Sequence, residues 1–189
     1  TPTREGYTFA GWYTQKDGGT QVTSSTKVTT AGARTLYAHW TPNKYTIVLN
    51  GNGGTVPSVS DLTNLTEGSG EVDDSTKRLV ATYASQGTFT VAVRRTGFKF
   101  TGWALADGTT TGITQGTISG SNGSYTMTGA KVLNLTTQAN GEVYLYAQWE
   151  AEYVTITLNP NGGSASPTTL YAKYGDVYAN ALTDKNASE

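Results

Sequence analysis

The stretch GYTFAGW, residues 6–12, recurs 91 residues later as GFKFTGW, residues 97–103. A second stretch, LYAHW at residues 36–40, recurs 109 residues later as LYAQW at residues 145–149. Self-similarity of this kind is the sequence signature of a repeat architecture. We therefore expect the chain to consist of repeated structural units.

A third stretch sets the limits of these units. YTIVLNGNGG at residues 45–54 recurs, again after 109 residues, as VTITLNPNGG at residues 154–163. One unit then runs from the Asn/Gly-rich turn strand, through the Gly-Trp strand, to the Leu-Tyr-Ala strand. This order predicts the C-terminal half of a unit at residues 1–40, a complete unit at 41–149, and the N-terminal half of the next unit at 150–189.

The two offsets differ, so the second copy is 18 residues longer between its Gly-Trp and Leu-Tyr-Ala stretches. Loops absorb insertions at little thermodynamic cost. We therefore predict that the extra residues form a loop in the Gly/Ser/Thr-rich span 108–129. The acidic, Gly/Ser-rich segment 58–73 is predicted to be a loop as well.

Alternating apolar positions predict strands in the recurring stretches. Tyr45, Ile47 and Leu49 alternate with more polar residues, which is typical of a half-buried strand. One helix is predicted from Asp74 or Ser75, as N-cap, to about residue 85, because apolar residues there recur at spacings of three to four. The sequence thus predicts a mainly β or α+β fold with at most one short helix in each unit.

The recurring aromatic residues are predicted to form the core. A buried Trp side chain covers about 200 Å², and losing one costs about 3–5 kcal/mol. The alternative interpretation is a platform on which sugars stack, which would require exposed rings. The predicted core residues are Phe9, Trp12, Trp40, Ile47, Leu49, Phe100, Trp103, Trp149, Ile156 and Leu158.

Composition excludes several classes of function. The net charge is −1, so the chain offers no basic surface for phosphates, and we expect no nucleic-acid binding. No run of about 18 apolar residues exists, so we expect no membrane insertion. The chain has no Cys, which excludes disulfides and thiolate metal sites. It begins at Thr1 rather than Met, so we expect it to be part of a longer protein, and its Thr-, Asn- and Gly-rich composition with little Lys and Glu is typical of an exported one.

Catalytic chemistry is not expected either. His39 is the one histidine, and a solvent-facing strand position is the expected interpretation because Gln148 takes its place in the second copy. Glu71, Asp73 and Asp74 cluster, but a glycosidase needs two carboxyl groups held across a cleft, so a solvated loop is favoured over a glycosidase or a Ca²⁺ site. The sequence predicts a protein without enzymatic activity, metal or cofactor.

One covalent possibility is a buried isopeptide bond between Lys and Asn. Its candidate donors are Lys44, Lys99, Lys131 and Lys173. No motif selects a pair among them.

The recurring motifs resemble the Listeria–Bacteroides repeat family, also called the internalin B-repeat type. The resemblance is carried by PTREGYTFAGWY at residues 2–13, LYAHW at 36–40 and NPNGG at 159–163. It implies small β-grasp-like modules with mixed sheets, arranged in tandem on bacterial surface proteins, where they act as stalks or adhesive spacers. It implies an extracellular location, at the bacterial cell surface or cell wall, and it supplies no catalytic residues.

The leading hypothesis is therefore a non-enzymatic cell-surface repeat module that acts as a stalk or spacer and in adhesion. Its expected partner is a surface protein or glycan of a host or neighbouring cell. The alternatives are a carbohydrate-binding module and an accessory domain of a cell-wall-acting enzyme. The half-units at the two ends are further expected to complete each other, preferentially between neighbouring molecules, because each one alone leaves an open sheet edge.

Overall fold

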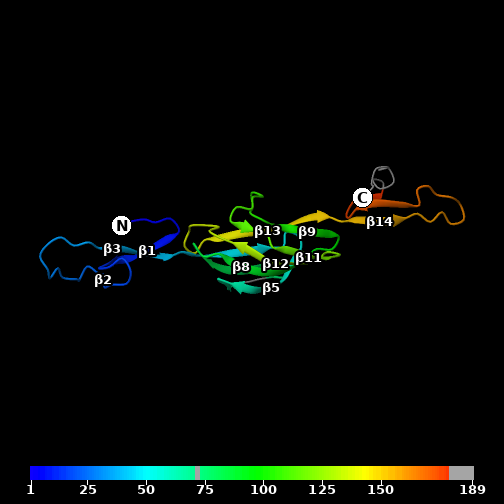
Figure 1. Ribbon diagram of the computed structural model, residues 1–189. Helices are drawn as coiled ribbons and strands as arrows, with labels where there is room; N and C mark the ends of the chain where they lie inside the picture. The colour runs from blue at the N-terminus through cyan, green and yellow to red at the C-terminus, as the bar shows by residue number, and fades with distance from the viewer. Residues whose placement is uncertain (71–72, 179–189) are drawn as a thin grey trace.

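The protein is built almost entirely from strands, and the computed structural model describes residues 1–70 and 73–178. Figure 1 shows an elongated arrangement in which a small N-terminal sheet, a larger central body and a C-terminal hairpin follow one another. The breaks between the sheets fall at Asn43 and Glu152, which lie outside any strand. The assignment of the three segments as repeat units stays a prediction.

The N-terminal sheet has the strand order β2-β1-β3. Its strands are β1 (Tyr7–Tyr13), β2 (Gln21–Val22) and β3 (Tyr37–Pro42). β1 and β3 pair antiparallel, and the register shifts between Phe9 and Gly11. Gly11 makes this bulge possible with a φ of 137°. As a result, Phe9 lies edge-to-face against both Trp12 and Trp40.

The central body contains a mixed five-stranded sheet of order β6-β7-β4-β13-β9. Its strands are β4 (Lys44–Asn50), β6 (Leu65–Glu67), β7 (Thr76–Thr82), β9 (Phe98–Ala104) and β13 (Glu142–Ala151). The central pair, β4 and β13, is parallel, and the other neighbours are antiparallel. The expectation of a mainly β fold with mixed sheets is confirmed.

A second sheet of the central body has the order β10-β12-β8-β5, with β11 paired to β12. Its strands are β5 (Thr55–Thr63), β8 (Gly87–Arg94), β10 (Ile113–Thr114), β11 (Thr117–Ser121) and β12 (Ser124–Val132). Along β8 every second residue from Gly87 to Val93 is buried. This alternation places one face of the second sheet against the mixed sheet.

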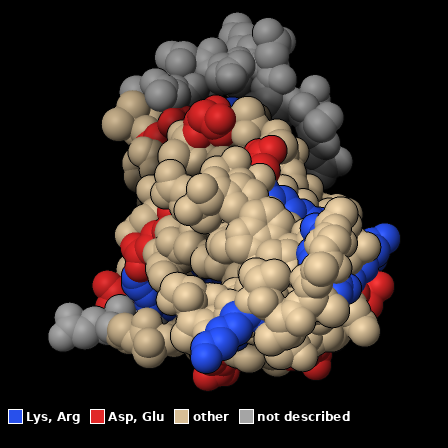
Figure 2. Space-filling view, turned by 90° about the vertical axis from the view of Figure 1, so that its left-hand side faces the viewer, with Lys and Arg blue, Asp and Glu red and all other residues tan. Residues whose placement is uncertain are grey.

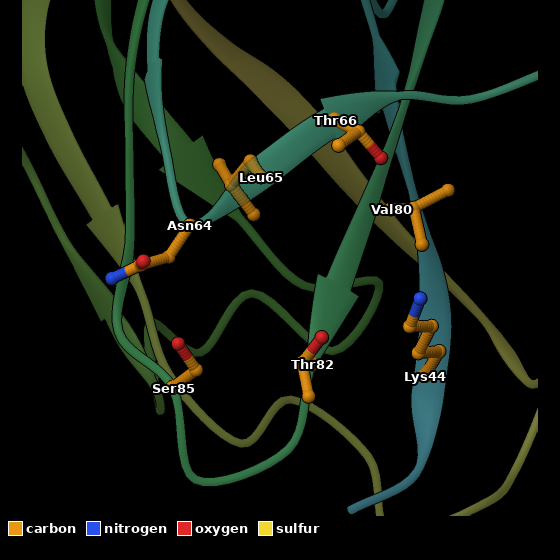
Figure 3. Close-up of a pocket in the computed structure, with 7 residues that line it drawn as sticks. All are labelled: Lys44, Asn64, Leu65, Thr66, Val80, Thr82 and Ser85. Carbon is orange, nitrogen blue, oxygen red and sulfur yellow. The ribbon is translucent and has the colours of Figure 1, made fainter.

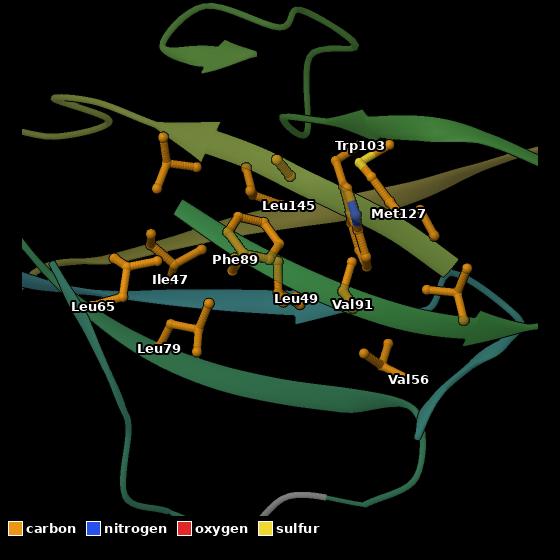
Figure 4. Close-up of a cluster of buried hydrophobic side chains, with 14 of the residues drawn as sticks. Ile47, Leu49, Val56, Leu65, Leu79, Phe89, Val91, Trp103, Met127 and Leu145 are labelled. Carbon is orange, nitrogen blue, oxygen red and sulfur yellow. The ribbon is translucent and has the colours of Figure 1, made fainter. Parts of the chain in front are cut away.

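The core lies between these two sheets. Leu49, Leu79 and Trp103 come from the mixed sheet, and Phe89 and Met127 come from the second sheet (Figure 4). All of them are buried. The C-terminal hairpin, β14 (Tyr153–Thr157) and β15 (Thr169–Lys173), has no such cover within the described residues.

Three local predictions are wrong. The predicted helix is β7, which pairs antiparallel with β4 and sets Leu79 opposite Ile47. The predicted loop at 58–73 contains most of β5 and all of β6, and the predicted loop at 108–129 contains β10, β11 and most of β12. The physical reason is the same in each case. The secondary structure of these segments depends on pairing with partner strands and on burial of a shared apolar face. A local residue pattern contains no information about either.

The β-grasp topology stays a prediction. The described residues of 41–149 contain no helix. Strands β8 and β12 of the second sheet cover the inner face of the mixed sheet.

Candidate functional site

The predicted core residues fall into two groups. In the central body, Ile47, Leu49, Phe100 and Trp103 are buried, and Trp149 packs partly buried against them. The remaining predicted core residues lie in the N-terminal sheet and the C-terminal segment. Four of them are half-buried: Phe9, Trp40, Ile156 and Leu158. The fifth, Trp12, is exposed.

The prediction that Trp12 is a buried core residue is wrong for this chain. Trp12 is 40% exposed, whereas Trp103 at the matching position is 1% exposed. Both rings pack edge-to-face against a Phe, at 5.5 Å and 5.6 Å between centroids. The difference arises because strands of a second sheet cover Trp103, and the described residues place no such strands over Trp12.

The single histidine has a structural environment. His39 stacks on Tyr13 at 3.9 Å with an angle of 7° between the rings, and its Nε2 lies 3.0 Å from the carbonyl oxygen of Gln15. In the described part of the chain, no hydroxyl or carboxylate is hydrogen-bonded to the imidazole. The arrangement holds the loop after β1 against β3.

The acidic cluster forms a turn. Asp73 accepts hydrogen bonds from the backbone N–H and the hydroxyl of Ser75, at 2.8 and 2.6 Å. These bonds, with the Ser75 hydroxyl first, lower the pKa of the Asp73 carboxyl below its usual range. Glu71 lies outside the described residues. Within 1–70 and 73–178, no group of three or more His, Asp or Glu side chains is placed to hold a metal ion.

The candidate isopeptide donors do not fit a buried cross-link. All four side chains are exposed: Lys44, Lys99, Lys131 and Lys173. A buried bond of this type requires a buried amine.

One open hollow of about 320 Å³ lies on the outer side of the mixed sheet (Figure 3). Its lining residues are Lys44, Asn64, Leu65, Thr66, Val80, Thr82 and Ser85. The lining holds one cation, an amide and several hydroxyl groups, and it contains neither a carboxylate nor an aromatic ring. It therefore offers no acid–base pair and no surface on which a sugar could stack.

The first junction joins the N-terminal sheet to the central body at Asn43. Its backbone N–H donates to the Gly6 carbonyl at 2.9 Å, and its carbonyl accepts from the Tyr83 N–H at 2.8 Å. The Tyr83 ring packs edge-to-face against Tyr7, at 5.6 Å and 76°. A Cβ at Gly6 would overlap the Tyr83 ring, and Arg4 covers Tyr7 at 4.0 Å. The central body is thus clasped to the N-terminal sheet.

The second junction repeats this geometry at Glu152. Its N–H donates to the Gly97 carbonyl at 2.9 Å, and its carbonyl accepts from the Tyr174 N–H at 2.8 Å. The Tyr174 ring packs edge-to-face against Phe98, at 5.8 Å and 70°. A Cβ at Gly97 would overlap the Tyr174 ring, and Arg95 covers Phe98 at 3.8 Å.

Sequence reasoning missed these two junctions, although a signal was present. LVATY at residues 79–83 recurs as LYAKY at residues 170–174, with the same offset of 91 residues as the Gly-Trp stretch. The match ends on the two junction tyrosines, Tyr83 and Tyr174. The same match also pointed to strands at β7 and β15, because Leu and Ala alternate in it.

The second junction carries a titratable group. The Tyr125 hydroxyl on β12 donates a hydrogen bond to the Glu152 carboxylate. Burial, together with this bond and the negative charge of Glu152, raises the pKa of Tyr125 to about 12. The folded pKa exceeds the unfolded value of about 10. Stability from this proton is therefore fully present below about pH 10 and is lost as the pH rises to about 12.

This shift predicts a late-titrating phenol. Tyrosinate absorbance should show a group that ionises near pH 12, above the ordinary tyrosine value of about 10, and Tyr125→Phe should remove it. The variant also separates Tyr125 from Tyr45, whose pKa is likewise raised by burial. Ionisation of Tyr125 at the ordinary tyrosine value of about 10 would contradict the contact with Glu152.

Comparison with known proteins gives a match to one family model and matches to individual proteins. Residues 1–39 match the family model of the Listeria-Bacteroides repeat domain. Over 102 residues, 54% of the chain is 34% identical to Internalin H from Listeria monocytogenes serovar 1/2a, and this match spans 15% of that protein. No solved structure matches the chain.

Two further relatives come from Evansella cellulosilytica. A protein described as a putative Gly-rich membrane protein is 29% identical over 95% of the chain, and a putative membrane protein is 28% identical over 93%. The matches span 18% and 20% of these relatives, so the chain corresponds to a fifth or less of each. Within the described part of the chain, no helix is long and apolar enough to cross a membrane.

The duplicated strands and junctions define a β-rich repeat protein. Residues 1–39 match the Listeria-Bacteroides repeat domain, and this match confirms the family resemblance of the recurring motifs in that segment.

Proposed function

We propose that the chain is part of a non-enzymatic bacterial surface protein in which the units form a stalk or spacer. The observation that carries the proposal is the duplicated junction at Asn43 and Glu152. A flexible linker would leave the two bodies free to turn. Here two backbone hydrogen bonds and an aromatic pair fix each body to the next, and the same contacts recur along the chain. A junction that repeats yields a rod whose length grows with the number of units.

Two further observations support a passive role. The described residues assemble no metal-binding cluster, and the lining of the hollow beside Lys44 contains no carboxylate. The family match at residues 1–39 and the similarity to Internalin H and to membrane proteins support a location at the bacterial surface. An adhesive role, with a surface protein or glycan of another cell as partner, belongs to the same proposal.

The rod proposal predicts that the junction glycines control stiffness. Gly6 and Gly97 have φ values of 75° and 77° and each lies under a tyrosine ring. Replacing both with alanine adds backbone strain of about 1–2 kcal/mol at each site and displaces the rings. We expect the open junction to become at least about tenfold more populated, which broadens the distance distribution in small-angle X-ray scattering.

The matched control uses Gly18 and Gly108. They have similar φ values of 71° and 80°, but a Cβ at either would meet no atom within 4 Å. Gly18→Ala with Gly108→Ala therefore adds similar backbone strain without touching a junction, and the scattering profile should stay that of the parent. A wild-type chain that already scatters as freely jointed bodies would contradict the stalk role.

Carbohydrate binding is the rival proposal, and one observation favours it. Tyr144 and Tyr146 stack at 6.3 Å and 22° on the outer side of the mixed sheet, and Tyr144 is 41% exposed. Sugars stack on such rings. Glycan-array binding by the chain would favour this rival or an accessory role beside a cell-wall-acting enzyme.

A further inference from the structure

The N-terminal sheet matches one half of the central mixed sheet. Trp12 pairs with Ala38 in the β1–β3 ladder, as Trp103 pairs with Ala147 in the β9–β13 ladder. Both ladders shift register at the same place, next to Gly11 and Gly102, whose φ values are 137° and 143°. β1 and β3 are therefore the structural counterparts of β9 and β13.

The C-terminal hairpin matches the other half. Ile156 pairs with Leu170 in β14–β15, as Ile47 pairs with Leu79 in β4–β7. In the central body the two halves meet through the parallel ladder of β4 and β13, where Leu49 lies opposite Leu145. The terminal segments thus carry the two sides of a ladder that neither of them makes alone.

A turn clasps the two halves together in the central body. The side-chain amide of Asn52 donates to the Ala147 carbonyl at 2.9 Å, and the Trp149 indole N–H donates to the Gly51 carbonyl at 2.8 Å. The turn itself is closed by a bond from the Asn52 N–H to the Asn50 side chain at 2.8 Å.

The C-terminal hairpin contains a turn of the same geometry. The Asn161 N–H donates to the Asn159 side chain at 2.9 Å, and φ is 46° at Asn161 against 49° at Asn52. Among the described residues, however, the side-chain amide of Asn161 and the Trp40 indole N–H donate no hydrogen bond. The groups that the turn would clasp, the Ala38 carbonyl and the Trp40 indole, lie in the N-terminal sheet.

The side chains that this ladder would cover are exposed. Leu36 is 40% exposed where Leu145 is fully buried, and Val154 is 45% exposed where Tyr45 is 1% exposed. Residues 33–36 lie outside β3, whereas their counterparts 142–145 form the part of β13 that pairs with β4. Within the described residues, no strand pairs with residues 33–36.

The opposite charge balance of the two terminal segments also favours their association. Residues 1–40 carry four Lys or Arg and two Asp or Glu, whereas residues 150–178 carry one and three. Seen from the end that holds β1 and β3, uncharged side chains cover most of the surface and charged ones are scattered over it (Figure 2). The two segments lie at opposite ends of the molecule, so the hairpin of one chain does not reach its own N-terminal sheet (Figure 1).

We propose that the β14–β15 hairpin of one copy adds to the β3 edge of a second copy. β14 runs parallel to β3, Leu158 lies opposite Leu36, and a five-stranded sheet of order β15-β14-β3-β1-β2 forms across the two chains. Asn161 of one copy donates to the Ala38 carbonyl of the other. Because the two contacting surfaces differ, the association is head-to-tail and continues into chains of copies. The proposal is independent of the stalk role, since it concerns the sheet edges and not the junctions.

Two single variants test the association. Light scattering of the 189-residue chain should give a mass that rises with concentration. Leu36→Asp blocks only the receiving edge and Leu158→Asp blocks only the hairpin, and each should weaken self-association at least about tenfold because a charge replaces a covered apolar side chain. Mixed together, the two variants retain one intact surface each. The mixture should therefore form a 1:1 dimer that does not grow further.

A concentration-independent monomer for the wild type would overturn the proposal. So would variants that assemble like the wild type, or a mixture that stays monomeric while circular dichroism shows both variants folded.

The register is tested separately by cross-linking, because the protein has no Cys of its own. The ladder of β4 and β13 sets Val48 opposite Tyr144, and the matching positions are Thr157 and Thr35. A Thr35→Cys copy mixed with a Thr157→Cys copy should form the mixed disulfide under mild oxidation. The control, Thr168→Cys, is also exposed but lies one strand further away, and it should cross-link at least about tenfold less, because a disulfide needs Cα atoms within about 7 Å. Equal cross-linking of both pairs would overturn the register.

Discussion

Replacing Trp103 with alanine should remove most of the stability of the central body. The Trp103 side chain is 1% exposed and packs edge-to-face against Phe100, with 5.6 Å between centroids. Truncation of a buried Trp leaves a cavity and costs about 3–5 kcal/mol, against a total of about 5–15 kcal/mol for a domain of ordinary stability. Urea denaturation followed by circular dichroism should show a large fall in the midpoint.

The repeat supplies its own control. Trp12 occupies the same position of the same motif and packs against Phe9 in the same way, but it is 40% exposed. Trp12→Ala should therefore cost about 1 kcal/mol, measured in dilute solution where copies do not associate. If the two variants lost equal stability, the burial that distinguishes the two rings would be contradicted.

The Asn52→Ala substitution has the second-largest expected effect. It removes the hydrogen bond to the Ala147 carbonyl and places alanine at a φ of 49°. A lost hydrogen bond costs about 0.5–1.5 kcal/mol, and a left-handed conformation costs alanine about 1 kcal/mol more. We expect the free energy of unfolding to fall by about 2 kcal/mol in the same denaturation measurement.

Asn161→Ala separates the two contributions. Asn161 has a φ of 46°, so the backbone cost is similar, but its side-chain amide has no acceptor among the described residues. We expect a loss of about 1 kcal/mol in dilute solution, together with weaker self-association. A loss equal to that of Asn52→Ala would mean that the Asn52 clasp adds nothing to stability.

The sequence predicted the recurring parts of the fold well. The Tyr-Ile-Leu alternation of residues 45–49 lies in β4, and the LYAQW stretch lies in β13. The Gly-Trp stretches form β1 and β9. These stretches can be predicted because a strand with one buried face has apolar side chains at every second position of the sequence.

The segments between the repeats were predicted poorly. Residues 79–83 satisfied a helical spacing, but residues 79–82 belong to strand β7, because β4 places Ile47 opposite Leu79. Strands β5 and β10 to β12 lie in Gly-, Ser- and Thr-rich segments that are typical of loops. Their few apolar residues, among them Val56 and Met127, are buried only because the mixed sheet lies beneath them.

The order of residues by itself determined the β-rich character of the chain and the similarity of residues 1–39 to the Listeria-Bacteroides repeat domain, because duplicated motifs require no partner to be recognised. Only the tertiary structure decided which copies of a motif are buried. Trp12 and Trp103 have similar local sequences, but burial depends on strands brought from elsewhere in the chain, and among the described residues only Trp103 is covered by them. The clasp between bodies was likewise set in three dimensions, where Tyr83 and Tyr174 meet glycines distant in sequence.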